Sequence, residues 1–153
     1  MSVKFKYLVV FLVSGLSLFT ITAQGSNEKN PYIVHRQGIF EIAGGHMEAL
    51  QAILLLGHPA KKDINFHATG ILEAFEHHGD AFPKGSDKGK TFAKKKIWFD
   101  PEGFETRDNA ARKAMIELIK ASEGSDQGLI KEKFAKLGKS CKGCHDDFRK
   151  KDD

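Results

Sequence analysis

Apolar side chains recur at helical spacing in the stretch that begins after Pro31 and ends at Gly57 and Pro59. This stretch carries two apolar stripes on roughly opposite faces of the predicted helix. A helix that is apolar on two sides has two surfaces to bury, so we expect one stripe to face the protein's own core and the other to face a second subunit. The first stripe comprises Ile33, Phe40, Met47, Leu50 and Leu54, and the second comprises Ile42, Ala49, Ile53 and Leu56.

Three further helices are predicted over about residues 63–78, 104–122 and 126–150. Asp63 is a plausible N-cap for the second helix, and Gly79 ends it. The inward positions of these helices, in chain order, are Ile64, Ala68, Ile71 and Phe75; Ala111, Met115, Leu118 and Ile119; and Ile130, Phe134, Leu137, Cys141, Cys144 and Phe148.

Residues 80–103 form the longest link between predicted helices. Proline and glycine interrupt this link, and a link of such length in a compact domain is often functional. Its aromatic residues indicate that it packs onto the helices. The interrupting residues are Pro83, Gly85, Gly89 and Pro101, and the aromatic residues are Phe92, Trp98 and Phe99. The fold class that follows is all-α: an antiparallel four-helix bundle with one long crossover between the second and third helices.

Residues 1–23 have the features of a secretory signal peptide. Lys4 and Lys6 precede an apolar run from Tyr7 to Ile21, and small residues follow, so we expect cleavage near residues 23–25. The alternative is a permanent membrane anchor, which the short apolar run and the lack of a stop-transfer pattern disfavour. We therefore expect an exported protein without stable membrane association, in which residues 24–153 form one domain.

Charge gives little information about partners. The 153-residue chain has a formal net charge of +4, and removal of residues 1–23 takes away two lysines and no acidic residue, which leaves +2. A charge this small and this dispersed gives no reason to expect a nucleic acid as partner.

The candidate chemistry of the chain lies in Cys141-Lys142-Gly143-Cys144-His145, a C-x-x-C-H motif of the kind that attaches haem c. Residues three and four apart share one face of a helix. The two thiols can therefore add to the two vinyl groups of one porphyrin, while the imidazole of His145 binds the iron. Because both cysteines lie on the apolar stripe of the last helix, we expect one covalently bound haem c inside the bundle.

A redox-active dithiol and a zinc site are the alternative uses of this motif. A thioredoxin-like dithiol stands at the start of a helix that follows a strand, whereas Cys141 and Cys144 lie near the end of a predicted helix. A structural zinc site needs four ligands in paired clusters, and the chain has no second pair at the required spacing. Both alternatives are therefore weaker than the haem.

From about Tyr32 to Lys151 the chain resembles cytochrome c prime, the class II c-type cytochromes. Three segments carry the resemblance, which covers essentially the whole predicted domain. They are Arg36-Gln37 with Phe40; Gly85-Ser86-Asp87-Lys88-Gly89 with Ile97-Trp98; and the run from Gly138 to Lys150 around the haem motif. A haem motif near the C-terminus distinguishes this class from class I cytochromes, which carry theirs near the N-terminus.

The resemblance implies a left-handed four-helix bundle in the periplasm, usually a homodimer built on the first two helices. It also implies a five-coordinate, high-spin haem iron. His145 would be the axial iron ligand and Phe40 would lie over the open face. The other cofactor-binding residues that it implies are Cys141 and Cys144, which attach the haem; Arg36 and Gln37, near the haem edge and its propionates; Trp98; and Arg149, beside the proximal face.

Phe40 decides which ligands this iron would favour. A phenyl ring cannot ligate iron and offers no hydrogen bond, whereas bound dioxygen gains much from a distal donor. Such a site favours nitric oxide and carbon monoxide. Plain core packing is the alternative role for Phe40. We expect a protein that binds these gases and can take part in electron transfer with an unknown periplasmic redox partner.

A second branch of class II cytochromes is low-spin and serves electron transfer, with methionine as the sixth iron ligand. Met47, two turns after Phe40, is the candidate here, and Met115 is a weaker one, although the methionine of that branch falls near the position of Phe40. The histidines are weaker candidates as well, namely His35, His46, His58, His67, His77 and His78. The pair His77-His78 has a favourable place at a helix end. The sequence shows no distal acid or base that would cleave an O–O bond, so we expect no enzyme activity.

Overall fold

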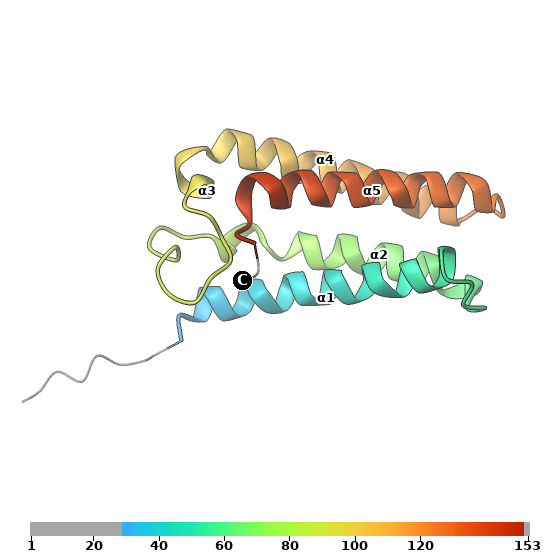
Figure 1. Ribbon diagram of the computed structural model, residues 1–153, viewed down its shortest axis with the longest axis horizontal. Helices are drawn as coiled ribbons and strands as arrows, with labels where there is room; N and C mark the ends of the chain where they lie inside the picture. Colours follow the sequence, from blue (N-terminus) through green and yellow to red (C-terminus); the bar gives the residue numbers. More distant parts are fainter. Residues whose placement is uncertain (1–28, 152–153) are drawn as a thin grey trace, which may run out of the picture.

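The computed structural model describes residues 29–151 and is dominated by four long helices that lie side by side along the long axis of the molecule (Figure 1). They are α1 (Pro31–Leu54), α2 (Ile64–Glu76), α4 (Pro101–Ser122) and α5 (Gln127–Phe148). The short elements η1 (Lys61–Asp63), η2 (Gly79–Ala81) and α3 (Lys96–Phe99) lie between them. The predicted all-α four-helix bundle is confirmed. The predicted signal peptide, residues 1–23, lies outside the described residues.

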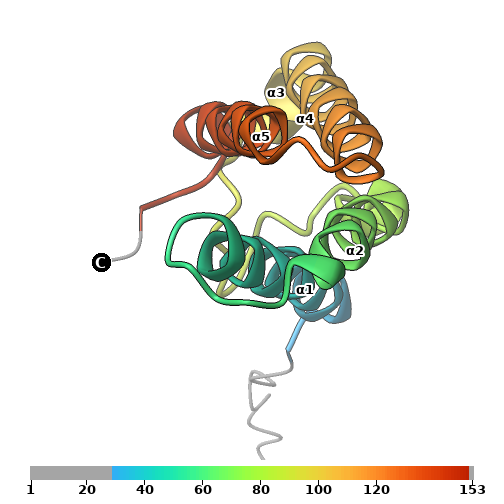
Figure 2. The ribbon, with the colours of Figure 1, turned by 90° about the vertical axis from the view of Figure 1, so that its right-hand side faces the viewer.

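The four helices pack as two close pairs. The most extensive contacts join α1 to α2 and α4 to α5, and α2 also packs against α4. Among the described helices, α1 and α5 do not pack closely against each other. The end-on view in Figure 2 shows the same separation. The bundle is therefore least tightly packed on the side where α1 faces α5. None of the helices in the described range is long and apolar enough to cross a membrane.

Side-chain caps fix the starts of three long helices. Asn30 accepts hydrogen bonds from the backbone N–H groups that open α1, and Asp126 does the same for α5. Asp100 caps α4, with Pro101 in the first turn, where proline is favoured because it lacks an N–H group that would be unpaired there. The prediction that the third helix begins at Phe104 was therefore wrong by one turn. Asp63, the predicted cap of α2, makes no side-chain cap hydrogen bond.

The crossover is more ordered than an extended link. It contains η2 and α3, and its glycines Gly85 and Gly89 have positive φ angles of 88° and 115°, which only glycine adopts without strain. An antiparallel bridge pairs Ala93 with Arg149, just after α5 ends. Lys94 N–H donates to Phe148 O at 2.8 Å, and Lys150 N–H donates to Phe92 O at 2.7 Å. These bonds hold the crossover against the end of the helix that carries the haem motif.

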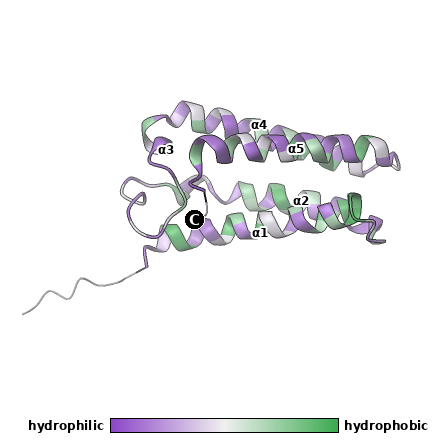
Figure 3. Ribbon diagram, viewed as in Figure 1, coloured by the Kyte–Doolittle hydropathy of each residue, from purple (hydrophilic) through white to green (hydrophobic). Residues whose placement is uncertain are grey.

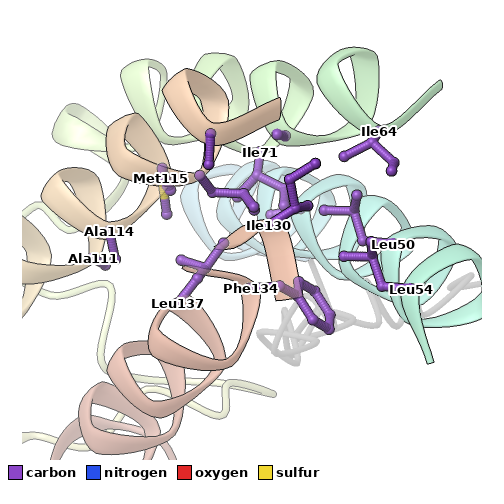
Figure 4. Packing of buried hydrophobic residues seen from close by; sticks show 14 of the residues in the cluster. Leu50, Leu54, Ile64, Ile71, Ala111, Ala114, Met115, Ile130, Phe134 and Leu137 are labelled. Atoms are coloured by element: carbon purple, nitrogen blue, oxygen red, sulfur yellow. The ribbon is translucent and has the colours of Figure 1, made fainter. Parts of the chain in front are cut away.

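The hydrophobic core runs between the four helices. Along their lengths α1 and α2 are richer in hydrophobic residues than α4 and α5 (Figure 3). Figure 4 shows side chains from all four meeting in the core. Most of the predicted inward positions are buried, and they include Ile64, Ala68, Ile71, Ala111, Met115, Leu118, Ile130, Phe134, Leu137 and Phe148. Phe75, Ile119 and Cys141 are partly buried against the same core.

The second predicted stripe of α1 is only partly exposed, contrary to our expectation that it faces a second subunit. Ile53, assigned to a subunit-facing stripe, is only 7% exposed and belongs to the protein's own core. On a helix it lies beside Leu50 and Leu54, at the border between the stripes, and packing against α2 draws it inward. Ile42 and Leu56 are exposed, at 57% and 75%, and therefore remain available to a partner.

Candidate functional site

The C-x-x-C-H motif lies in the last two turns of α5. Cys141 and Cys144 are one turn apart, half-buried, and both are free thiols. Cys141 packs against the hydrophobic core, while His145 is exposed at the end of the helix. Cys141 therefore lies on the inward face of α5, as the apolar stripe predicted, and Cys144 follows one turn later at a half-buried position.

Burial keeps both thiols neutral. It raises the pKa of Cys141, and it raises the pKa of Cys144 to about 11, to which the negative charge of Asp108 contributes. A reactive dithiol needs a lowered thiol pKa, because the thiolate is the nucleophile. The surroundings of these cysteines thus speak against the dithiol alternative. In the part of the chain that the structure describes, no three metal-ligating side chains come together to support the zinc alternative.

A cluster of aromatic rings gathers at the same end of the bundle, and its members come from different parts of the chain. Phe40 of α1 lies 5.7 Å from Phe75 of α2 and 6.3 Å from Phe82 of the crossover, centroid to centroid. Phe82 lies 5.0 Å from Phe104 of α4, which in turn lies 5.3 Å from Phe148 at the end of α5. These rings provide the apolar surface that a flat macrocycle needs.

Arg36 is buried inside the crossover rather than directed to solvent. It is 3% exposed, and its guanidinium donates to Ala81 O, Ser86 Oγ, Ser86 O and Thr91 Oγ1 at 2.5–3.2 Å. Burial lowers the pKa of Arg36, and Asp87 opposes this effect. Gln37 makes a longer bond, at 3.3 Å, to Lys90 O. Both residues fasten the crossover to α1, and their predicted contact with haem propionates stays a prediction.

Trp98 and Arg149 also hold the crossover. The indole N–H of Trp98 donates to the carbonyl oxygens of Phe82 and Pro83 at 3.0 and 3.2 Å. The guanidinium of Arg149 lies 5.2 Å from the centre of the Phe92 ring. The predicted cofactor contacts of Trp98 and Arg149 stay predictions, as does the position of Phe40 over the iron.

His78 and Asp108 form a pair that the sequence did not reveal. The sequence suggested a helix-end position for His78, yet its side chain is buried, at 5% exposure. Its Nε2 lies 2.7 Å from Asp108 Oδ1, and Asp108 also accepts a hydrogen bond from Arg112. His78 is 30 residues before Asp108, so no local pattern signals the contact. The ring of His78 stacks on Phe40, with centroids 5.8 Å apart.

The two methionines of the alternative reading take part in core packing. Met115 is fully buried in the core, and Met47 packs against the core from α1. Packing in the hydrophobic core accounts for the positions of both side chains.

The residues at this end fit a c-type haem. Two free thiols stand one turn apart on α5, a histidine follows them, and aromatic rings from several elements line the region. The side between α1 and α5 is also the least tightly packed part of the bundle. A macrocycle with two vinyl groups and one iron atom requires these features together.

Comparison with known proteins agrees with this assignment. A sequence model of the family described as Cytochrome C' matches residues 32–149. Cytochrome c' from Rhodospirillum rubrum is 30% identical over 142 residues, which cover 92% of this chain and 97% of that protein. Cytochrome c prime from Shewanella frigidimarina shares the fold with a TM-score of 0.75 and 34% identity, covering 78% of this chain and 94% of that one.

A more distant structural relative is a variant of cytochrome c prime from Alcaligenes xylosoxidans, solved as a nitric oxide complex. It is 24% identical, with a TM-score of 0.72, and covers 79% of this chain and 94% of that one, which shows the common fold. The family model and the Rhodospirillum rubrum relative both span nearly all of the helical domain. The chain therefore belongs to the cytochrome c prime family of haem proteins.

Proposed function

We propose that this protein is a periplasmic haem c protein whose iron is five-coordinate and high-spin, and which binds nitric oxide and carbon monoxide. Membership of the family supports the haem, and the C-x-x-C-H motif supports its covalent attachment. The observation that carries the proposal is the position of Phe40. Its ring is half-buried among Phe75, His78 and Phe82, at the same end of the bundle as the motif.

Each residue of the motif has a distinct task in this proposal. Haem, when bound, supplies an iron atom that takes a diatomic gas as ligand. Cys141 and Cys144 hold the macrocycle to α5, and His145 binds the iron from the proximal side. The rings of Phe104 and Phe148 would shield the bound macrocycle from water.

Phe40 sets the ligand preference on the opposite side. Its ring cannot bind iron, and its bulk disfavours ligands that need much space or a strong hydrogen-bond network. Nitric oxide and carbon monoxide bind without such a network, whereas dioxygen depends on it more. The Alcaligenes xylosoxidans variant, which has the same fold, was solved with nitric oxide bound. That observation concerns nitric oxide binding by the Alcaligenes protein.

Absorption and EPR spectra of the purified holoprotein test the proposal. We expect high-spin spectra in the ferric and ferrous states, a new species when nitric oxide is added to the ferrous protein, and little response to dioxygen. A low-spin spectrum with a methionine-to-iron band and no response to the gases would contradict it. That result would favour the second candidate, an electron-transfer cytochrome with Met47 or Met115 as ligand.

The proposal includes export and self-association. Export predicts that the mature protein begins near residues 23–25, which mass spectrometry of the periplasmic form can check. Three exposed apolar residues favour a homodimer: Ile42 on α1, Leu56 just after α1, and Phe66 on α2. Sedimentation of an Ile42→Glu, Leu56→Glu variant as a dimer would reject that interface. We propose electron transfer as a secondary role and no steady enzymatic turnover.

A further inference from the structure

His78 carries a buried polar atom that nothing in the described structure satisfies. Its Nε2 is paired with Asp108, but its Nδ1 has no hydrogen-bond partner among the described residues and is shielded from solvent. A buried polar group without a partner is costly and uncommon in native proteins. Nδ1 is therefore available to a group that binds within the site.

The surroundings of the His78 ring are otherwise apolar. The ring stacks on Phe40 with an interplanar angle of 26° and lies edge-to-face against Phe75 and Phe82, at centroid distances of 5.1 and 6.3 Å. None of these three rings can donate or accept a conventional hydrogen bond. Nδ1 is thus a single polar atom beside the residue that we place over the haem iron.

Asp108 determines which nitrogen of His78 carries the proton. Burial alone would raise the pKa of Asp108, but hydrogen bonds from His78 and Arg112 outweigh burial and hold the pKa below its usual value. An ionised carboxylate accepts, so the Nε2 that faces it holds a hydrogen, and Nδ1 then has a lone pair whenever the ring carries one proton. Asp108 also lies close enough to Cys144 to raise the pKa of that thiol. The His78–Asp108 pair is therefore in contact with Phe40 and acts electrostatically on Cys144.

We propose that His78 Nδ1 is a proton acceptor for weak-acid ligands of the haem, such as hydrogen cyanide or hydrogen sulfide. When such an acid binds to the ferric iron as its anion, the H–C or H–S bond breaks and its proton goes to Nδ1. His78 becomes an imidazolium, which Asp108 stabilises, and no electron is transferred. The inference rests on the proposed function, because it requires an open iron position on the Phe40 side.

Other charged groups around His78 have partners of their own. On α4, Arg112 bonds to Asp108 and to Glu76 of α2. On α1, Arg36 lies over the Phe82 ring and bonds to the crossover. On α5, Cys144 carries no charge in the holoprotein, because the proposed bond to the haem leaves its sulfur without an ionisable proton. Asp108 is consequently the charged group paired directly with His78.

This arrangement separates two classes of ligand. Nitric oxide and carbon monoxide bring no proton to the site, so they gain nothing from a base. A weak acid must lose its proton in an apolar cluster, and a positioned base typically contributes a factor of about 10²–10⁴ to such a step.

Stopped-flow binding of cyanide to the ferric holoprotein tests the inference, with nitric oxide binding to the ferrous form as the proton-free reference. His78→Leu should slow cyanide association at least about tenfold more than it slows nitric oxide association. Asp108→Asn should also slow cyanide, because the amide carries no stabilising charge and no longer fixes the hydrogen on Nε2. His77→Leu, at the exposed neighbouring position, is the matched control and should behave as the wild type.

The fate of the proton gives a second readout that a purely structural role would not change. In weakly buffered solution at about pH 8, well above the ordinary histidine pKa of about 6.5, an indicator dye should show little proton release when cyanide binds to the wild type. The His78→Leu variant should release one proton for each cyanide bound. Release of a full proton by the wild type would overturn the inference, even if the variant failed to fold.

Failure of this inference is distinguishable from failure of the proposed function. A ferrous wild-type protein that does not bind nitric oxide would refute the open gas site. A wild-type protein that binds nitric oxide, with equal cyanide rates and equal proton release in the wild type and His78→Leu, would refute only the role of His78.

Discussion

The two ends of the bundle are built on different principles. We call the end where α1 leads to α2 and α4 leads to α5 the apolar half; its interior consists of residues such as Leu50, Leu54, Ile64, Ile130 and Phe134. The other end, where the crossover meets the haem motif, is the crossover half. The buried polar residues of the described chain all belong to it: Arg36, His78, Ser86 and Thr91.

The difference shows what each half needs. Regular helices satisfy their own backbone groups, so the apolar half requires only close packing of side chains. The crossover is irregular, and its buried carbonyl groups must find donors elsewhere. Arg36 supplies several of them from one side chain. In the crossover half, stability and the haem site therefore depend on specific polar pairs as well as on packing.

Loss of packing in the apolar half should have the largest effect on stability. Leu118 is fully buried, and Leu118→Ala should lower the free energy of unfolding by about 3–4 kcal/mol, through lost burial and the cavity left behind. Chemical denaturation of the holoprotein measures this change. Ile116→Ala, at an exposed position on the same helix, should cost no more than about 0.5 kcal/mol. Equal losses for the two variants would argue against the core that we describe.

Loss of the Arg36 bonds should have a smaller effect that is concentrated in the crossover half. Arg36→Met keeps much of the apolar stem but removes donors to Ser86 and Thr91, and should cost about 2–3 kcal/mol. Limited proteolysis should show faster cleavage within the crossover. Arg107→Met removes an exposed arginine that pairs with Asp147 and serves as the control, with an expected cost below about 1 kcal/mol. Unchanged proteolysis of Arg36→Met would mean that other contacts hold the crossover.

The smallest of the three effects should be a pH dependence from the contact between α1 and α2. His46 Nδ1 lies 3.0 Å from His67 Nδ1, so one ring donates and the other accepts. Burial and then the proximity of His67 lower the pKa of His46 below its ordinary value of 6.5. The unfolded chain therefore binds this proton at higher pH than the folded protein does, and stability should fall as the pH drops below about 6.5.

Thermal unfolding as a function of pH measures this effect. His46→Gln should reduce the loss of stability in acid, whereas the same change at the exposed His35 should not. Equal acid sensitivity of both variants and the wild type would assign the effect to other groups. Gly70 allows the contact, because a Cβ atom there would lie 2.4 Å from the His46 ring.

The apolar half was readily predicted from the sequence, and the crossover half was not. Helical periodicity identified Met115, Leu118 and Leu137 as buried, because apolar residues at that spacing form one face of the helix, which packs against the core. The start of α4 was missed because Pro101 was taken as a break, although proline is also suited to a first turn. Ile53 was misplaced because it lies at the border between two faces.

The residues of the candidate site also differ in how well the sequence predicted them. The haem motif is contiguous, so its residues were found directly. Arg36 was recognised from the family resemblance, but its buried bonds reach residues 81–91, far along the chain, and periodicity does not predict a buried arginine. The pairing of His78 with Asp108 depends on how α2 and α4 pack, and no single-sequence pattern contains that information.

The bridge between Ala93 and Arg149 has a consequence for the order of assembly. Because synthesis proceeds from the N-terminus, α1 and α2 can pair before residue 150 exists, whereas the bonds from Lys94 to Phe148 and from Lys150 to Phe92 cannot form until α5 is complete. Until they form, the thiols of Cys141 and Cys144 stand on a helix whose end is not yet fastened. The covalent attachment that we propose would therefore be least hindered before these hydrogen bonds form.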